Sequence, residues 1–153
     1  MPPLMADPLE LPRTWRPLGA RLAGWFFGAM LFLVCAVAWV TFPQEVRDSV
    51  TWSQRVTLLL LGLMIGGAFH AVVRSRVVAS DAGLEIVNGY RRHEFSWAQV
   101  VTVTLPAGAP WATLDLNDGT SVSAMGIQGS DGTRARLAVR ELRSLLDRFH
   151  EAD

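Results

Sequence analysis

Two long apolar stretches dominate the first half of the chain. Between Leu18 and Phe42 the only charged side chain is Arg21, and between Val56 and Val73 there is none. Because a helix rises about 1.5 Å per residue, roughly 20 apolar residues cross the hydrocarbon core of a bilayer. The pattern predicts a transmembrane hairpin over residues 18–73. Its spans are expected at residues 18–42 and 56–73, after a short N-terminal segment, residues 1–17.

The charges around these stretches predict an orientation. Arg13, Arg16 and Arg21 lie at the start of the first stretch, and Arg74 and Arg76 follow the second, whereas acidic residues offset the arginines of the intervening loop. Because basic flanks stay on the cytoplasmic side, we expect a multi-pass protein of the cell (inner) membrane with both termini in the cytoplasm. Four tryptophans are expected near the membrane interfaces: Trp15, Trp25, Trp39 and Trp52.

A cleavable signal peptide is the alternative interpretation of the first stretch. Basic residues precede an apolar region that reaches a small-residue sequence at Ala36–Ala38, as a cleavage site requires. The apolar run continues to Phe42, however, and the second stretch would anchor the protein in either case. A transmembrane hairpin is therefore the preferred prediction.

Each apolar stretch contains two glycines four residues apart. These pairs are Gly24 with Gly28 and Gly62 with Gly66, and such spacing lets helix backbones approach closely. The pairs are predicted to be helix-packing sites, either within the hairpin or toward a second copy or another membrane protein. His70, near the end of the second stretch, is expected to be a packed neutral or snorkelling side chain.

The pattern changes after Arg76 to short β-branched runs separated by turn residues, which is typical of antiparallel strands. Strands are predicted at residues 76–80, 84–87, 90–95, 100–105, 111–116 and 120–125. A helix of about five turns is then predicted from apolar residues at helical spacing, namely Ala135, Ala138, Leu142, Leu145, Leu146 and Phe149. Ser130 or Asp131 is expected to cap this helix. Residues 74–150 therefore read as a small α+β domain.

The acidic segment around Gly119 has two interpretations, a metal loop and a turn. A calcium loop starting at Asp115 would need a ligand where Gly119 stands and a glutamate where Gly126 stands. A three-residue hairpin loop, residues 117–119, instead places apolar residues opposite one another on one face, as a buried face requires. We predict a turn with Gly119 left-handed in a bulge.

Composition and charge narrow the function classes. The basic residues are all arginine, and residues 77–153 carry seven of them against ten acidic residues, so an acidic second half argues against nucleic-acid binding. The single cysteine, Cys35, excludes a disulfide framework. The three histidines have no metal-ligand spacing, and no phosphate-binding loop or nucleophile elbow occurs. We expect no catalytic residue, no metal site and no cofactor.

Four segments in a fixed order carry a resemblance to a known family. They are "DAGL" at Asp81–Leu84, "SW" at Ser96–Trp97, "PWATLDLNDG" at Pro110–Gly119 and "IQGSDGTRA" at Ile127–Ala135. With two preceding apolar stretches, the chain resembles actinobacterial membrane-anchored bacterial PH-domain proteins of the low molecular weight protein antigen 6 type. The resemblance implies a PH-like antiparallel β-barrel with a C-terminal capping helix. It implies no particular activity.

Three function classes follow from these observations. The preferred one is a non-catalytic interaction or scaffolding module on the cytoplasmic face, for example an accessory subunit of a membrane complex, with Trp97 and Trp111 either as exposed anchors or in the core. The alternative is an anionic-lipid-binding module that uses a basic rim of arginines, namely Arg74, Arg76, Arg91 and Arg92. An enzyme is the third class. The expected partners are the lipid bilayer and another membrane protein or a second copy.

Overall fold

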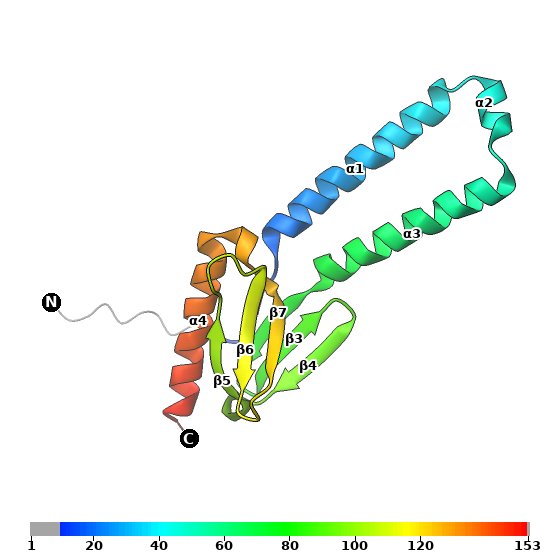
Figure 1. The fold of residues 1–153 in the computed structure, drawn as a ribbon. Helices are drawn as coiled ribbons and strands as arrows, with labels where there is room; N and C mark the ends of the chain where they lie inside the picture. Colours follow the sequence, from blue (N-terminus) through cyan, green and yellow to red (C-terminus); the bar gives the residue numbers. More distant parts are fainter. Residues whose placement is uncertain (1–9, 153) are drawn as a thin grey trace.

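A small domain lies at one end of a helical hairpin in the computed structural model, which describes residues 10–152 (Figure 1). The hairpin consists of α1 (Leu18–Thr41), α2 (Gln44–Ser49) and α3 (Trp52–Arg74). The two long helices match the predicted spans, although α3 starts before residue 56. It does so because Thr51 and Gln54 form a reciprocal capping box, in which each side chain accepts a hydrogen bond from the other residue's backbone N–H.

The domain contains two antiparallel sheets and a C-terminal helix. The first sheet has four strands in the order β1 (Arg13–Trp15), β2 (Arg76–Ser80), β3 (Gly83–Asn88) and β4 (Arg91–Phe95). The second has three, β5 (Val100–Thr104), β6 (Trp111–Leu116) and β7 (Ser121–Gln128). Short 3-10 turns, η1 (Trp97–Gln99) and η2 (Gly129–Asp131), precede β5 and the final helix α4 (Thr133–His150). The predicted barrel is thus a pair of sheets, with no ladder closing them among the described residues.

The N-terminal segment supplies a strand that the sequence pattern did not predict. β1 pairs antiparallel with β2, with Trp15 opposite Val77. The whole hairpin is therefore inserted between two neighbouring strands of one sheet. The domain boundary predicted at residue 74 leaves β1 out, and Trp15, expected at the membrane interface, lies in the domain core with 8% of its surface exposed. Three residues are too short a run for any periodicity to be visible.

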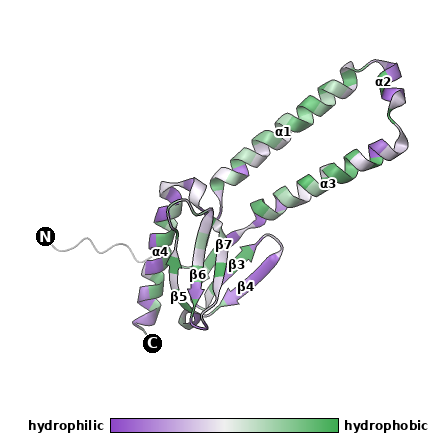
Figure 2. Cartoon of the chain, viewed as in Figure 1, coloured by the Kyte–Doolittle hydropathy of each residue, from purple (hydrophilic) through white to green (hydrophobic). Residues whose placement is uncertain are grey.

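The core lies between the two sheets and the apolar face of α4. Alternate residues of β6, namely Ala112, Leu114 and Leu116, point inward, as a half-buried strand requires. The predicted apolar face of α4 is confirmed, since Ala135, Ala138, Leu142, Leu145 and Leu146 are buried. Figure 2 shows the contrast with α1 and α3, which are coloured hydrophobic along most of their length although none of their residues is buried.

Asn88 and Gly126 hold the two sheets together. The Asn88 side chain donates a hydrogen bond to the Ser123 carbonyl and accepts one from the Met125 N–H, so its amide pairs with the backbone of β7. At Gly126 a Cβ atom would come within 2.7 Å of the backbone of Arg76. The strand ranges predicted from sequence, 84–87 and 90–95, leave Asn88 and Gly89 for this turn, but the β3–β4 hairpin loop consists of Gly89 and Tyr90, since Asn88 pairs with Arg91.

The register of the β6–β7 hairpin is as predicted. Ala112 lies opposite Ala124 and Leu114 opposite Val122, and Gly119 is left-handed with φ of 84°. β7 continues past the predicted end at residue 125 to Gln128. The strand continues through Gly126 because the absence of a side chain there lets β7 pass close to β2.

Candidate functional site

The acidic β6–β7 loop has a structural role. The Asp115 carboxylate accepts a hydrogen bond from the Ser121 hydroxyl at 2.6 Å, and Asp118 accepts two from Thr120, through its hydroxyl at 2.7 Å and its backbone N–H at 2.8 Å. The two bonds from Thr120 lower the pKa of Asp118. They favour the folded loop at neutral pH and are lost as pH falls through that lowered value. No group of three metal-binding side chains occurs among residues 10–152.

The antiparallel strands divide the loops between two ends of the domain. Because β2 begins where α3 ends, one end carries the β3–β4 turn, the β5–β6 loop (residues 105–110), η2 and the start of α4. We call this the helix-proximal end. A hydrogen bond from the Gly129 N–H to the Pro110 carbonyl joins two of these segments. At the opposite end, His150 contacts the Trp97 carbonyl at 3.1 Å.

The β3–β4 turn is fastened to the end of α3. Ser75, which is buried, accepts a hydrogen bond from the Gly89 N–H at 3.0 Å and donates one to the Ala71 carbonyl at 3.1 Å. The Tyr90 hydroxyl lies 3.0 Å from His70 Nδ1. These contacts fix the angle between α3 and the first sheet. His70 itself is exposed on α3, with the Tyr90 hydroxyl as its side-chain contact.

Asp131 fastens the other helix. Its two carboxylate oxygens accept hydrogen bonds from the backbone N–H groups of Leu18 and Gly19, at 3.0 and 2.8 Å, and these groups belong to the first turn of α1. The prediction that Ser130 or Asp131 caps the following helix is wrong, since Gly132 occupies that N-cap position without a side-chain bond. The free N–H groups at the start of α1 and of α4 can both be capped by a carboxylate, so the local sequence could not show which of the two helices Asp131 caps.

Asp131→Ala should loosen the start of α1. Losing an N-cap side chain costs about 0.5–2 kcal/mol, so amide hydrogen exchange at Leu18 and Gly19 should accelerate by roughly 2- to 30-fold in the full-length protein in micelles. Ser130→Ala is the matched control, because its exposed side chain makes no hydrogen bond among the described residues. Faster exchange in the first turn of α4, with α1 unchanged, would contradict the assignment.

The four arginines of the predicted basic rim differ in their surroundings. Glu85 on β3 pairs with both Arg76 and Arg92, at 2.9 and 3.1 Å, and Arg92 also pairs with Glu94. Arg74 lies over the Tyr90 ring at 5.9 Å. Arg91 is exposed beside the β3–β4 turn. The charge of the rim is thus partly neutralised by the carboxylates between its members.

The two tryptophans proposed as partner contacts lie in different environments. Trp97 is buried, stacks on Phe149 with ring centroids 4.5 Å apart, and donates its indole N–H to the Ser80 carbonyl. Trp111 is half-buried at the start of β6, opposite Gln128. Trp97 therefore stabilises the end of α4 and offers no free surface, whereas Trp111 exposes part of its ring.

Of the four glycines predicted to pack helices, one contacts the other helix of the hairpin. The Phe69 ring of α3 occupies the space where a Gly24 side chain would lie. Gly28, Gly62 and Gly66 have no atom within 4 Å of that position. The structure does not bring the two glycine pairs together, and the contact between α1 and α3 lies at the helix-proximal end.

The edges formed by β5 and β4 are poorly suited to pairing with an added strand. The Arg143 side chain of α4 donates a hydrogen bond to the Val103 carbonyl at 2.6 Å, which occupies an acceptor of β5. β4 pairs with β3 alone among the described strands, but it carries charged residues from Arg91 to Glu94. Charged edge strands discourage pairing with another chain.

Comparisons with known proteins agree with this architecture. The family model described as "Bacterial PH domain" matches residues 74–145. Uncharacterised proteins of Mycobacterium tuberculosis and Mycobacterium bovis are each 33% identical over 137 residues, covering 88% of this chain and 86% of the relative. The likeness to these relatives thus extends beyond the matched domain into the helical hairpin. No solved structure matches the sequence significantly. On the family model and the relatives together, the chain belongs to the bacterial PH domain family.

Proposed function

We propose that the protein is a non-catalytic PH-like module, anchored in the cell membrane by its helical hairpin and displayed on the cytoplasmic face. It would serve as an interaction or scaffolding subunit for another membrane protein or a second copy. The observation that carries this proposal is the pairing of β1 with β2 across the hairpin. The pairing makes the hairpin an insertion between two paired strands of one domain.

The β1–β2 pairing constrains the topology. Trp15 and Val77 lie opposite each other in one sheet, so the start of α1 and the end of α3 must be on the same side of any membrane. The two helices have 24 and 23 residues with mean hydropathies of 2.1 and 2.2 and no buried residue. At about 1.5 Å per residue each is roughly 35 Å long, enough to cross a bilayer and return. The arginines at the helix-proximal end favour the cytoplasmic side.

The structural contacts made by the titratable side chains support a non-catalytic binding role. The side chains of Asp118, Asp131, Glu141 and Glu85 each hold loops, helices or strands in place. The three histidines lie on separate elements, and His70 and His150 contact a tyrosine and a backbone carbonyl. A domain held rigidly at the bilayer surface is suited to presenting a fixed face to a membrane-embedded partner.

The topology is tested by cysteine labelling of intact cells. In a Cys35→Ser background, Glu45→Cys in the loop between the long helices and Arg140→Cys on α4 provide two exposed reporters. A membrane-impermeant maleimide is expected to label the first in intact cells and the second only after lysis. Labelling of Arg140→Cys in intact cells would reject the cytoplasmic placement.

The interaction role is tested by gentle detergent purification from the native membrane. We expect the protein to copurify with a defined membrane protein or in several copies, at constant stoichiometry. A matched purification of a variant with Trp111→Ala measures whether the half-exposed indole contributes to that contact. A monomer without companion proteins in both preparations would reject the role.

A further inference from the structure

A cavity of about 370 Å³ lies at the helix-proximal end, between β1, β7 and the first half of α4. Consecutive residues line two of its walls, residues 13–16 in one and residues 126–128 of β7 in another. Successive side chains of a strand point to opposite faces, so a wall built from consecutive residues is formed by the edge of a strand. The cavity therefore lies between two strand edges that belong to different sheets.

The outer edge of β1 is unpaired. β1 pairs with β2 alone among the described strands, and no backbone hydrogen bond joins residues 13–16 to β7 or to α4 within residues 10–152. An unpaired edge presents N–H and C=O groups to any extended chain that comes to lie beside it. Because β1 has three residues, its edge offers a few hydrogen bonds and little surface for unspecific pairing.

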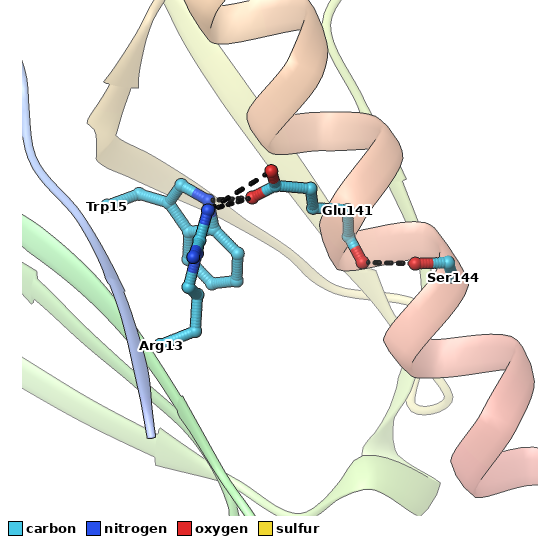
Figure 3. Close-up of polar contacts among 4 residues, drawn as sticks. All are labelled: Arg13, Trp15, Glu141 and Ser144. Carbon is cyan, nitrogen blue, oxygen red and sulfur yellow. Dashed lines mark hydrogen bonds and ion pairs between the residues drawn. The ribbon is translucent and has the colours of Figure 1, made fainter. Parts of the chain in front are cut away.

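Both carboxylates in the lining are already engaged. Asp131 accepts two backbone N–H bonds from α1, as described above. Glu141 accepts a hydrogen bond from the Trp15 indole at 2.9 Å and forms an ion pair with Arg13 at 3.2 Å, as Figure 3 shows. The acidic side of the cavity is therefore neutralised from within the domain, and the same contacts hold β1 against α4.

Two further arginines of the lining have no such partner. Arg16, which follows β1, and Arg134, in the first turn of α4, are exposed and make no ion pair among residues 10–152. Apolar side chains complete the lining, among them Ile127, which is buried, and Leu137, which is 47% exposed. The cavity thus combines an unpaired strand edge, two free guanidinium groups and an apolar surface.

We propose that this cavity receives a short extended segment of a partner membrane protein, in which acidic and apolar residues alternate, by strand addition to β1. In such contacts backbone hydrogen bonds supply affinity, and side chains at alternate positions supply specificity. The acidic side chains of the segment form charge-assisted hydrogen bonds with Arg16 and Arg134, and its apolar side chains contact Ile127 and Leu137. The inference rests on the proposed interaction function and names the chemistry of the partner.

The short edge favours a partner that is anchored in the same bilayer. Each added hydrogen bond contributes little net free energy in water, so a free peptide binds weakly to three residues of strand. Arg16 lies just before the start of α1, which places the cavity beside the helical hairpin. A segment tethered to the same membrane is held at an effective concentration on the order of millimolar, and weak contacts then suffice. We therefore expect the segment directly before or after a transmembrane helix of the partner.

The test titrates a peptide onto the full-length protein in micelles of an uncharged detergent. The probe is a blocked peptide of alternating glutamate and valine. The indole N–H signal of Trp15 in the NMR spectrum reports its binding, because that indole bonds to Glu141 in the cavity lining. We expect a saturable shift of this signal. A peptide with lysine in place of glutamate should bind roughly tenfold more weakly, and so should the glutamate peptide methylated at its backbone amides.

The double variant R16Q/R134Q should also lose about tenfold in affinity for the glutamate peptide, as expected for removing hydrogen bonds between charged groups. The charge-matched control R140Q/R148Q, which removes two arginines of α4 that do not line the cavity, should bind the peptide like the wild type. Thermal unfolding of each variant, with R16Q and R134Q tested singly, separates loss of binding from loss of fold.

Several outcomes would overturn the proposal. One is the absence of a saturable shift at the millimolar peptide concentrations that tethering supplies. Equal losses in the two double variants would reduce the effect to general electrostatics, and undiminished binding of the methylated peptide would exclude strand addition. Displacement of the glutamate peptide by an equal concentration of dioctanoyl phosphatidylglycerol would assign the cavity to a lipid.

Failure of this proposal is distinguishable from failure of the proposed function. The peptide titration uses purified protein and does not depend on whether a companion protein is found, whereas copurification does not depend on the cavity. A companion that copurifies equally well with R16Q/R134Q rejects the cavity alone. A monomer without companion proteins rejects the interaction role on which the cavity proposal rests.

Discussion

Trp15→Ala is expected to lower the free energy of unfolding of the domain by about 3–5 kcal/mol, the cost of truncating a large buried aromatic side chain. Trp15 precedes the hairpin, yet only 8% of its surface is exposed and its indole N–H bonds to Glu141 on α4. The loss combines a cavity in the core with a weakened contact between β1 and α4. The change in the free energy of unfolding is measured by urea titration of the full-length protein in micelles, with hydrogen exchange of the β2 amides as the probe of the domain.

Trp25→Ala provides the matched control. Trp25 lies on α1 with 69% of its surface exposed, so its truncation removes no contact of the domain and should leave the domain's unfolding free energy within about 0.5 kcal/mol. Trp15→Phe should fall between the two, since it keeps most of the apolar volume and loses the bond to Glu141. If Trp15→Ala unfolds like the wild type, β1 does not belong to the domain.

Gly126→Ala is expected to destabilise the domain by about 1–3 kcal/mol, toward the upper end of that range, because forced overpacking displaces neighbouring atoms. The added Cβ would lie 2.7 Å from the Cα and carbonyl carbon of Arg76 and from the N atom of Val77. These are backbone atoms within a strand, so no side-chain rotation relieves the contact. The midpoint of thermal unfolding should fall by roughly 5–20 °C for a domain of this size.

Gly28→Ala is the control for that substitution. The space around Gly28 is open to at least 4 Å, and alanine is a better helix former than glycine. The domain's thermal midpoint should therefore be unchanged in Gly28→Ala. An unchanged midpoint in Gly126→Ala as well would show that β7 does not cross β2 as closely as described.

The inserted hairpin has a consequence for how the domain is studied and how it folds. A fragment starting at residue 74 contains the region matched by the family model but lacks β1 and Trp15. It leaves the edge of β2 unpaired, and exposed strand edges promote aggregation. In the full chain, β1 can pair with β2 only after the whole hairpin has been synthesised, because the hairpin lies between the two strands in the sequence. Completion of the first sheet is therefore coupled to formation of the hairpin.

Some features of the protein could be predicted from local pattern alone. The two long helices, the helix face of α4 and the register of the β6–β7 hairpin each follow from hydrophobic periodicity over many residues. The hairpin register was specified because only one pairing places Leu114 and Ala112 against apolar partners. The prediction that the acidic segment forms a turn rested on the same strand pairing and on the mismatch between its residues and the ligand positions of a calcium-binding loop.

Tertiary structure alone decided the rest, because it brings together residues far apart in the chain. Asp131 caps α1 and not α4. The Asn88 side chain binds the backbone of β7 and not that of the β3–β4 turn. Local sequence does not distinguish these partners, because a carboxylate or an amide oxygen accepts a hydrogen bond from any suitably placed N–H group. Trp15 is a core residue because β1 pairs with a strand that follows the entire hairpin. The cavity between Arg16 and Arg134 likewise exists only where β1 meets α4. Periodicity reports which residues are buried within one element, whereas the partner of that element is set by packing across the whole chain.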